Sequence, residues 1–215
     1  MKSVLISIKP KWCEKICHQI GEENGNPVYE KRVEIRKSKS SCEVPFKAYI
    51  YCTQSGKYID GKQVMNIWMN RGTDNRYIGN GKVIGEFVCD KIDTYYYRNM
   101  DYPIPKFEGD DSVYEVGNGY YITSGELEKT CLTYEELEDY GKGKTLYGWH
   151  ISDIVIYDKP KELSEFYTKK ICNSCKKSGY ESTACMYDED CKVPVPITRA
   201  PQSWCYVEEL KEIKK

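Results

Sequence analysis

Short apolar runs, each bounded by glycine, proline or asparagine, are the feature that most limits how this 215-residue chain can fold. In several of them apolar and polar side chains alternate, which is the pattern of a half-buried β-strand. The runs cover residues 4–8, 28–37, 46–52, 82–92, 148–157 and 202–208. Five or six short strands separated by turn signals predict a mainly β, α+β protein built on a small β-barrel with short flanking helices.

Two helices and three insertions are expected between these strands. An amphipathic pattern predicts a helix over residues 10–20, and Thr133 with Glu136 three residues later is the capping-box signal of a second helix. A chain of this length can bury a core of its own, so we expect residues 1–215 to form a single domain. Irregular insertions are expected at about 53–80, 93–125 and 169–196.

The composition excludes some classes of protein and favours others. With 32 basic and 33 acidic residues the net charge is −1, so binding of nucleic acid must depend on a local patch. No window approaches the ~18 apolar residues of a membrane span, and the apolar run after Ser3 is too short for a signal peptide. Eleven cysteines without a secretion signal favour the reducing environment of the cytoplasm.

The predicted strand at 28–37 carries more charge than an ordinary strand. Val33 and Ile35 form an apolar face, and the other face presents Lys31, Glu34 and Arg36 in a row. If the strand lines a cleft, these charges converge on a ligand outside the core. If it lies at an exposed edge, they form a solvated face that discourages pairing with other strands. The pattern alone leaves both interpretations open.

The order of the elements around this strand resembles a known family, the ASCH-domain proteins of the PUA-like superfamily, in a bacterial and phage subgroup. The family signature is a glycine, a lysine two residues later, and an arginine five residues after the lysine. Lys31 and Arg36 match it, and Tyr29 stands in place of the glycine. The similarity covers residues 8–16, 31–37, 45–52, 81–90, 147–160 and 201–206.

The resemblance implies a PUA-like β-barrel whose cleft faces RNA, a nucleotide or a nucleoside. Arginine and lysine on the charged strand can grip a phosphate or a polar base edge. Trp12 follows the first strand and can stack on a base, although a core position is the alternative. The candidate ligand-binding residues are Lys9, Trp12, Lys31, Glu34, Arg36, Ser203 and Trp204.

The same resemblance raises an enzymatic alternative, with Lys31 and Glu34 as the catalytic candidates. Some small members of the family resemble acetylcytidine amidohydrolases, which use a lysine and a threonine on this strand and a distant glutamate. Lys31 matches that lysine, but Glu34 stands where those enzymes have threonine. A ribonuclease needs a group that handles protons, for which Glu34 is the candidate, with Lys31 and Arg36 stabilising phosphoryl charge.

The cysteines of the third insertion have the character of a structural zinc site. Cys172 and Cys175 form a Cys-x-x-Cys pair, and Cys185 and Cys191 follow. Four thiolates make a closed tetrahedral site, which would fold a segment that has almost no apolar residues of its own. The spacing of the second pair is looser than usual, so free thiols and an adventitious disulfide are the alternatives.

We therefore expect a cytoplasmic protein that binds RNA or a nucleotide through a cleft lined by Lys31, Glu34 and Arg36. Zinc is the expected structural cofactor, and no membrane contact is expected. A hydrolase acting on a modified nucleoside or on RNA is the first alternative. The second is an interaction module of phage or host origin that meets a protein partner through the tyrosine-rich residues 93–125.

Overall fold

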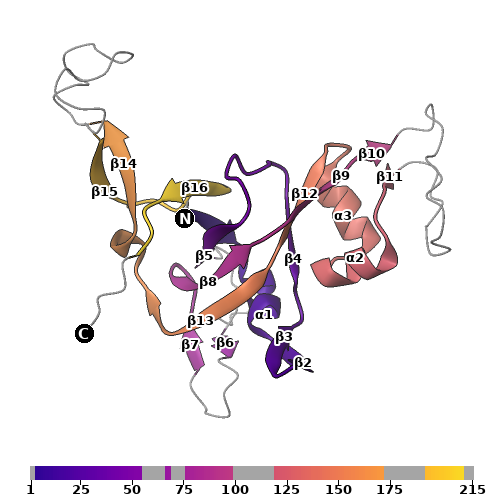
Figure 1. Ribbon diagram of the computed structural model, residues 1–215, viewed down its shortest axis with the longest axis horizontal. Coiled ribbons are helices and arrows are strands. Elements are labelled where there is room, and N and C mark those ends of the chain that lie inside the picture. Colours follow the sequence, from indigo (N-terminus) through magenta and orange to yellow (C-terminus); the bar gives the residue numbers. More distant parts are fainter. Residues whose placement is uncertain (1–2, 55–65, 69–75, 99–118, 172–191, 211–215) are drawn as a thin grey trace.

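A five-stranded sheet forms the largest part of the fold in the computed structural model of the protein (Figure 1). β1 and β5 pair in parallel, and the other neighbouring strands pair antiparallel. In order across the sheet, the strands are β13 (Ser152–Lys161), β8 (Val83–Cys89), β5 (Phe46–Cys52), β1 (Ser3–Ile8) and β16 (Trp204–Val207). The structure describes residues 3–54, 66–68, 76–98, 119–171 and 192–210.

The connection from β1 to β5 places a helix against this sheet, because two parallel strands need a crossover between them. Helix α1 (Pro10–Cys17) buries one face, which includes Cys13 and Ile16. This face joins the core of the large sheet, whose buried residues include Val4, Ile6, Ile50, Ile84 and Phe87. The start of α1 therefore lies directly after the end of β1, packed against the large sheet.

Helix α1 is shorter than the sequence pattern predicts. The helix expected over residues 10–20 ends at Cys17, because His18 is extended with a ψ of 106°. The next strand, β2 (Gln19–Glu23), pairs with β3 (Asn26–Tyr29) in a hairpin. Asn24 and Gly25 form its turn with φ angles of 52° and 77°, the backbone conformation that an Asn-Gly turn favours.

The charged strand predicted at 28–37 is two strands separated by a break. β3 ends at Tyr29, and β4 (Val33–Arg36) begins only after Arg32. Within the break, the backbone N–H of Lys31 donates to the carbonyl of Lys15 (3.1 Å), and that of Arg32 donates to the carbonyl of Lys129 (2.9 Å). The prediction of one continuous strand is wrong, because carbonyls of two helices satisfy these donors in place of a neighbouring strand.

A smaller sheet, in the order β4-β12-β9, contains β12 (Leu146–His150) and β9 (Ile92–Tyr95). Helices α2 (Ser124–Thr130) and α3 (Tyr134–Gly141) lie beside it (Figure 1). Its core is a cluster of buried residues that consists of Val33, Ile35, Tyr95, Tyr120, Ile122, Leu137 and Leu146. The apolar face of β4 therefore packs against the helical layer, as its alternating pattern predicts.

Both helices of this layer begin with the same signal. The capping box of Thr133 and Glu136 is confirmed at the start of α3. An identical box of Thr123 and Glu126 starts α2, at the end of the segment of about residues 93–125 that was expected to be irregular. The sequence interpretation missed α2, although the threonine with a glutamate three residues later is visible in the sequence.

The prediction of a barrel is not borne out: among the strands that the structure describes, no sheet closes on itself. Both edges of β1 are occupied, by β5 and by β16, so β4 has no edge of β1 to pair with. The strand predicted at 148–157 is also divided, because the chain leaves the small sheet after His150 and joins the large sheet at Ser152. The two sheets therefore meet as an open pair.

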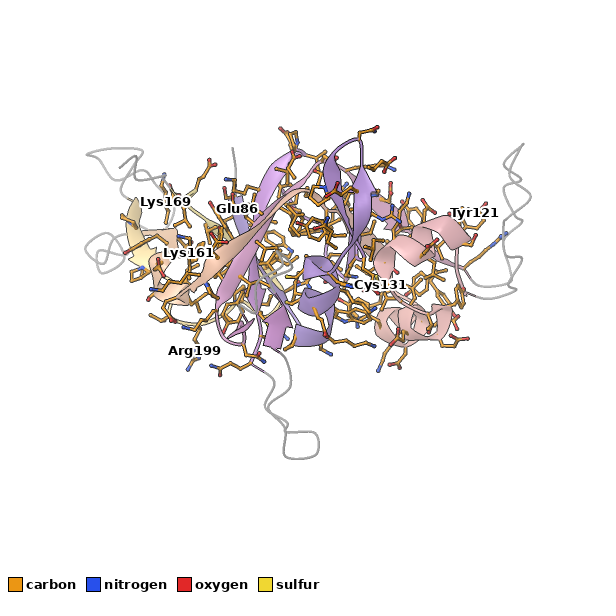
Figure 2. All side chains as sticks on the ribbon, turned by 90° about the horizontal axis from the view of Figure 1, so that it is seen from below. Glu86, Tyr121, Cys131, Lys161, Lys169 and Arg199 are labelled. Carbon is orange, nitrogen blue, oxygen red and sulfur yellow. The ribbon has the colours of Figure 1, made fainter. Side chains whose placement is uncertain are left out.

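Shorter elements complete the described chain. Three antiparallel strand pairs are β6–β7 (Asn66–Trp68 and Arg76–Ile78), β10–β11 (Tyr97–Arg98 and Gly119–Tyr120) and the hairpin β14–β15 (Tyr167–Ile171 and Lys192–Pro196). A 3₁₀ turn, η1 (Leu163–Glu165), precedes β14. The β14–β15 hairpin lies at the opposite end of the molecule from α2 and α3, as Lys169 and Tyr121 show in Figure 2. The candidate zinc ligands Cys172, Cys175, Cys185 and Cys191 lie outside the described residues. In the described part, none of the helices has the length and apolar character needed to cross a membrane.

Candidate functional site: a cleft above a buried ion cluster

A cleft of about 780 Å³ opens where α1, β4, α3 and the loop before β16 meet. All but one of the ligand-binding residues predicted from the sequence line it, namely Lys9, Trp12, Lys31, Glu34, Arg36 and Ser203. They come from distant parts of the chain. The open meeting of the two sheets is what brings them together.

The three charged side chains of the predicted strand lie at the floor of this cleft and are almost completely buried. Their exposed fractions are 1% for Lys31, 5% for Glu34 and 7% for Arg36. The alternative of a solvated strand face is therefore wrong. Lys31 lies on the side of Glu34 and Arg36, as expected, but not because of alternation, which in one continuous strand would put it with Val33. The break before β4 brings it there.

Glu34 lies between the two cations. Its Oε1 accepts a hydrogen bond from Arg36 Nη1 at 3.1 Å, and its Oε2 lies 3.4 Å from Lys31 Nζ. Burying charges is costly unless they are paired and hydrogen-bonded. Each of the two carboxylate oxygens faces a cation here, so the negative charge of Glu34 is held in one place.

Arg36 joins the two sheets through its side chain. Nη1 also donates to the carbonyl of Ser7 at 3.1 Å, and Nη2 donates to the carbonyl of Ser203 at 2.6 Å and to its Oγ at 3.1 Å. Ser7 belongs to β1 and Ser203 directly precedes β16. These bonds connect β4 to β1 and to the residue before β16, which do not pair with it as strands.

Lys31 is anchored by a helix terminus and by an aromatic ring. Its Nζ donates to the carbonyl of Thr130 at 2.5 Å, and it lies 5.0 Å from the ring centre of Trp12. Thr130 is the last residue of α2, where the helix dipole favours a cation. Trp12 therefore faces the cleft with Lys31 beside it, and only part of its ring belongs to the core.

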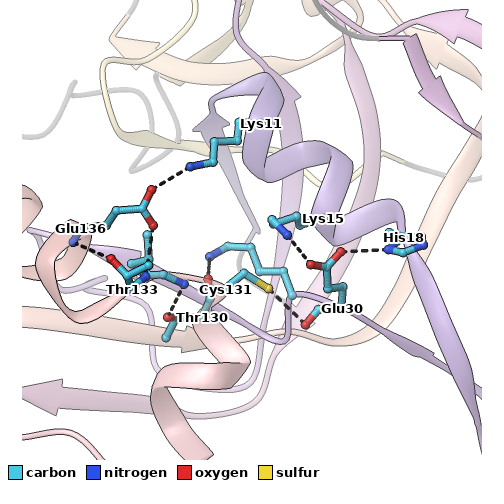
Figure 3. Close-up of polar contacts among 10 residues, drawn as sticks. Lys11, Lys15, His18, Glu30, Thr130, Cys131, Thr133 and Glu136 are labelled. Carbon is cyan, nitrogen blue, oxygen red and sulfur yellow. Dashed lines mark hydrogen bonds and ion pairs between the residues drawn. The ribbon is translucent and has the colours of Figure 1, made fainter. Parts of the chain in front are cut away.

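The rim and walls of the cleft contain residues that the sequence interpretation missed. Lys11 on α1 pairs with Glu136 at the start of α3 across 2.8 Å (Figure 3). Lys37 Nζ lies 4.9 Å from the ring centre of Tyr140, a second aromatic residue that lines the cleft. Burial raises the pKa of Tyr140, so its hydroxyl stays protonated at neutral pH. Lys11 and Lys37 adjoin predicted residues in sequence, whereas no local signal singles out Tyr140.

Ser203 and Trp204, both predicted to bind a ligand, differ in their position relative to the cleft. Ser203 lines the cleft, where its Oγ accepts the bond from Arg36. Trp204 lies beside the cleft and does not line it: its Nε1 donates to Ser38 Oγ at 3.1 Å, and its ring centre is 6.0 Å from that of the buried Trp149. The side chain of Trp204 therefore packs against the core of the large sheet.

The cysteines near the cleft are not activated. Burial raises the pKa of the Cys13 thiol well above its usual value and that of Cys17 to about 12. Cys131, which follows α2, donates its thiol hydrogen to the carbonyl of Glu30 (3.3 Å), and burial raises its pKa as well (Figure 3). Because the thiolate is the nucleophile, we assign no catalytic role to these thiols.

The chemistry of the described residues at the cleft is that of hydrogen bonding and charge. No group of three or more histidine, cysteine, aspartate or glutamate side chains within the described ranges is arranged to hold a metal ion. Two hydroxyls at the floor are engaged, since Ser7 Oγ donates to the carbonyl of Pro201 at 2.6 Å and Ser203 Oγ accepts from Arg36. His150 lies elsewhere, with its Nε2 2.6 Å from Asp93 Oδ2.

Comparison with known proteins gives matches among solved structures. The sequence matches no protein-family model and no curated protein. The structure is similar to that of ASCH from Zymomonas mobilis, with a TM-score of 0.45 and 13% identity over 97% of this chain and 89% of that one. A single-substitution variant of the same protein matches with a TM-score of 0.45 and 12% identity over 97% and 92%. Both solved structures are of an ASCH protein.

The ASCH signature residues that the sequence resemblance picks out, Lys31 and Arg36, both lie at the floor of the cleft. Tyr29, in the place of the signature glycine, ends β3 in the hairpin that precedes the break. The segment before Lys31 is a complete β-hairpin of β2 and β3, and Lys31 lies on the side of Glu34.

Proposed function

We propose that this protein binds RNA or a nucleotide in the cleft above Lys31, Glu34 and Arg36. The observation that carries the proposal is the burial of these three charges at the floor of a cleft that also has aromatic walls. Buried ions often stabilise a fold no more than apolar side chains of the same volume would. Their retention beneath an open cleft is consistent with a role in recognition.

The size and charge of the cleft fit this class of ligand. Its volume of about 780 Å³ is within the range of roughly 300–1,000 Å³ that small-molecule sites have, so it can enclose a nucleotide. Its lining includes five cationic and three anionic side chains, an excess of positive charge that suits a ligand with phosphate near the rim residues Lys9 and Lys37. Trp12 and Tyr140 offer faces on which a base can stack.

The rim lysines give the sharpest test, because they can be changed without disturbing the buried floor. We expect the double substitution Lys9→Ala/Lys37→Ala to weaken binding of a short single-stranded RNA at least tenfold, measured by fluorescence anisotropy. The dependence of the logarithm of affinity on the logarithm of salt concentration should become shallower by about 1.4, since each phosphate contact to a single strand contributes about 0.7.

Lys144→Ala/Lys159→Ala is the matched control, because both lysines are exposed and neither lines the cleft. Its affinity and salt dependence should equal those of the wild-type protein. If the rim variant binds RNA and mononucleotides as tightly as this control does, the cleft is not the binding site.

A further inference from the structure

The guanidinium of Arg36 has no accessible hydrogen-bond donor left for a ligand. Its Nη1 and Nη2 donate to the carbonyls of Ser7 and Ser203, to Ser203 Oγ and to Glu34, which uses all its N–H groups except Nε–H. The Nε atom is buried and has no acceptor among the described residues. Arg36 therefore positions Glu34 and does not form a fork for phosphate.

Lys31 is committed in a similar way. One N–H of its ammonium donates to the carbonyl of Thr130, a second faces Glu34, and the Trp12 ring lies beside the group. Its exposed fraction of 1% is the smallest of the three, so these protein groups cover the ammonium. The hydrogen-bond donors of both floor cations, Lys31 and Arg36, are therefore used or covered by groups of the protein and are not available to a ligand.

Glu34 is the floor residue with capacity to spare. A carboxylate offers about four acceptor positions, of which one receives Arg36 and one faces Lys31. Its side chain lines the cleft, and the two cations prevent it from turning away. The floor thus presents hydrogen-bond acceptors on a fixed carboxylate, which suits N–H donors of a ligand and repels phosphate and carbonyl oxygens.

On the basis of the proposed nucleotide-binding function, we propose that the cleft selects guanine, with Glu34 accepting hydrogen bonds from N1–H and the 2-amino group. Guanine carries two adjacent N–H donors on its Watson–Crick edge, which match the two oxygens of one carboxylate. The phosphate then lies toward the rim, where Lys9 and Lys37 border the cleft. Trp12 or Tyr140 supplies the stacking face.

The other bases fit this floor less well. Adenine and cytosine place a ring nitrogen acceptor beside their amino group, and that acceptor would face the carboxylate. Uracil has a single N–H between two carbonyl oxygens, both of which the carboxylate repels. Hypoxanthine keeps N1–H but lacks the 2-amino group. A buried polar site discriminates strongly against an analogue that leaves one of its groups unpaired.

Calorimetric titration with GMP, IMP, AMP, CMP and UMP tests this selectivity. We expect GMP to bind about 10- to 100-fold more tightly than IMP, the discrimination typical of a bidentate contact. The same ratio should appear between pentanucleotides that carry a central guanosine or inosine in a uridine context. Glu34→Gln should bring GMP and IMP to within about twofold of each other, whereas Glu128→Gln, on the exposed surface of α2, should keep the wild-type ratio.

The outcomes separate this inference from the function on which it rests. Equal affinity for all five nucleotides, or tighter binding of AMP, CMP or UMP, overturns guanine selection and leaves nucleotide binding intact. Absence of binding to every nucleotide and oligonucleotide overturns both. If circular dichroism shows that Glu34→Gln does not fold, the ratio of GMP to IMP affinity in the wild-type protein decides the question alone.

Discussion

Glu34 holds the floor of the cleft together through its buried carboxylate. It is the partner that Lys31 and Arg36 share, at distances of 3.4 and 3.1 Å. Each cation also donates to backbone carbonyls, but these are neutral and do not balance its charge. Both the stability of the protein and the shape of the cleft floor therefore depend on the side chain of Glu34.

Replacing Glu34 with alanine should destabilise the protein by about 3–5 kcal/mol, because two buried cations lose the charge that compensates them. Urea unfolding followed by tryptophan fluorescence measures this change. Glu128→Ala, on the exposed face of α2, should cost less than about 0.5 kcal/mol. Equal unfolding midpoints for the two variants would show that the ion cluster contributes nothing to stability.

Local sequence signals predicted which helices and strands are present more reliably than where each one begins and ends. The capping box predicted at Thr133 is present, and the last strand lies within its predicted range. The extents failed where a tertiary contact competed with a local pattern. Helix α1 stops at Cys17 because the next residues pair in a hairpin, and the charged strand breaks because Lys31 and Arg32 donate to helix carbonyls.

The cap of α3 gives a prediction at this scale. Thr133→Ala should lower the free energy of unfolding by about 1 kcal/mol, because the backbone N–H of Glu136 loses its acceptor. Thr133→Ser keeps a hydroxyl at the same position and should unfold near the wild-type midpoint. Thermal melts of the three proteins measure the difference, and a loss of equal size in the serine variant would exclude the cap as its cause.

At the scale of the whole molecule, the two main sheets meet at the cleft. The side chain of Arg36 bridges them, the chain passes from one to the other between His150 and Ser152, and Trp149 of the small sheet packs into the core of the large one. The helical layer of α2 and α3 lies at one end, and the β14–β15 hairpin lies at the other (Figure 1). The cysteine-rich residues between β14 and β15 are outside the described part of the chain. Zinc binding by Cys172, Cys175, Cys185 and Cys191 stays a prediction.

Native mass spectrometry of protein prepared with zinc should find a single zinc ion per chain, and a strong chelator should remove it and lower the melting temperature. Cys172→Ser/Cys175→Ser should abolish the zinc adduct. Cys131→Ser/Cys205→Ser changes two half-buried thiols elsewhere in the fold and should retain it. A wild-type mass without zinc, or zinc retained in the first variant, would contradict the four-thiolate site.

The sequence by itself determined the mainly β composition, the apolar face of β4, the cap of α3 and the candidates Lys31, Glu34 and Arg36. These depend on periodicity and on spacing within a few residues, which a single chain segment carries in itself. Only the tertiary structure decided that β16 occupies the edge of β1, that the sheets stay open, and that Arg36 reaches Ser203, 167 residues away in the sequence. The physical reason is that an alternating pattern gives a strand two faces without saying what each face meets. In the folded protein the three charged side chains are buried at the floor of a cleft, where the carboxylate of Glu34 has unused acceptor positions.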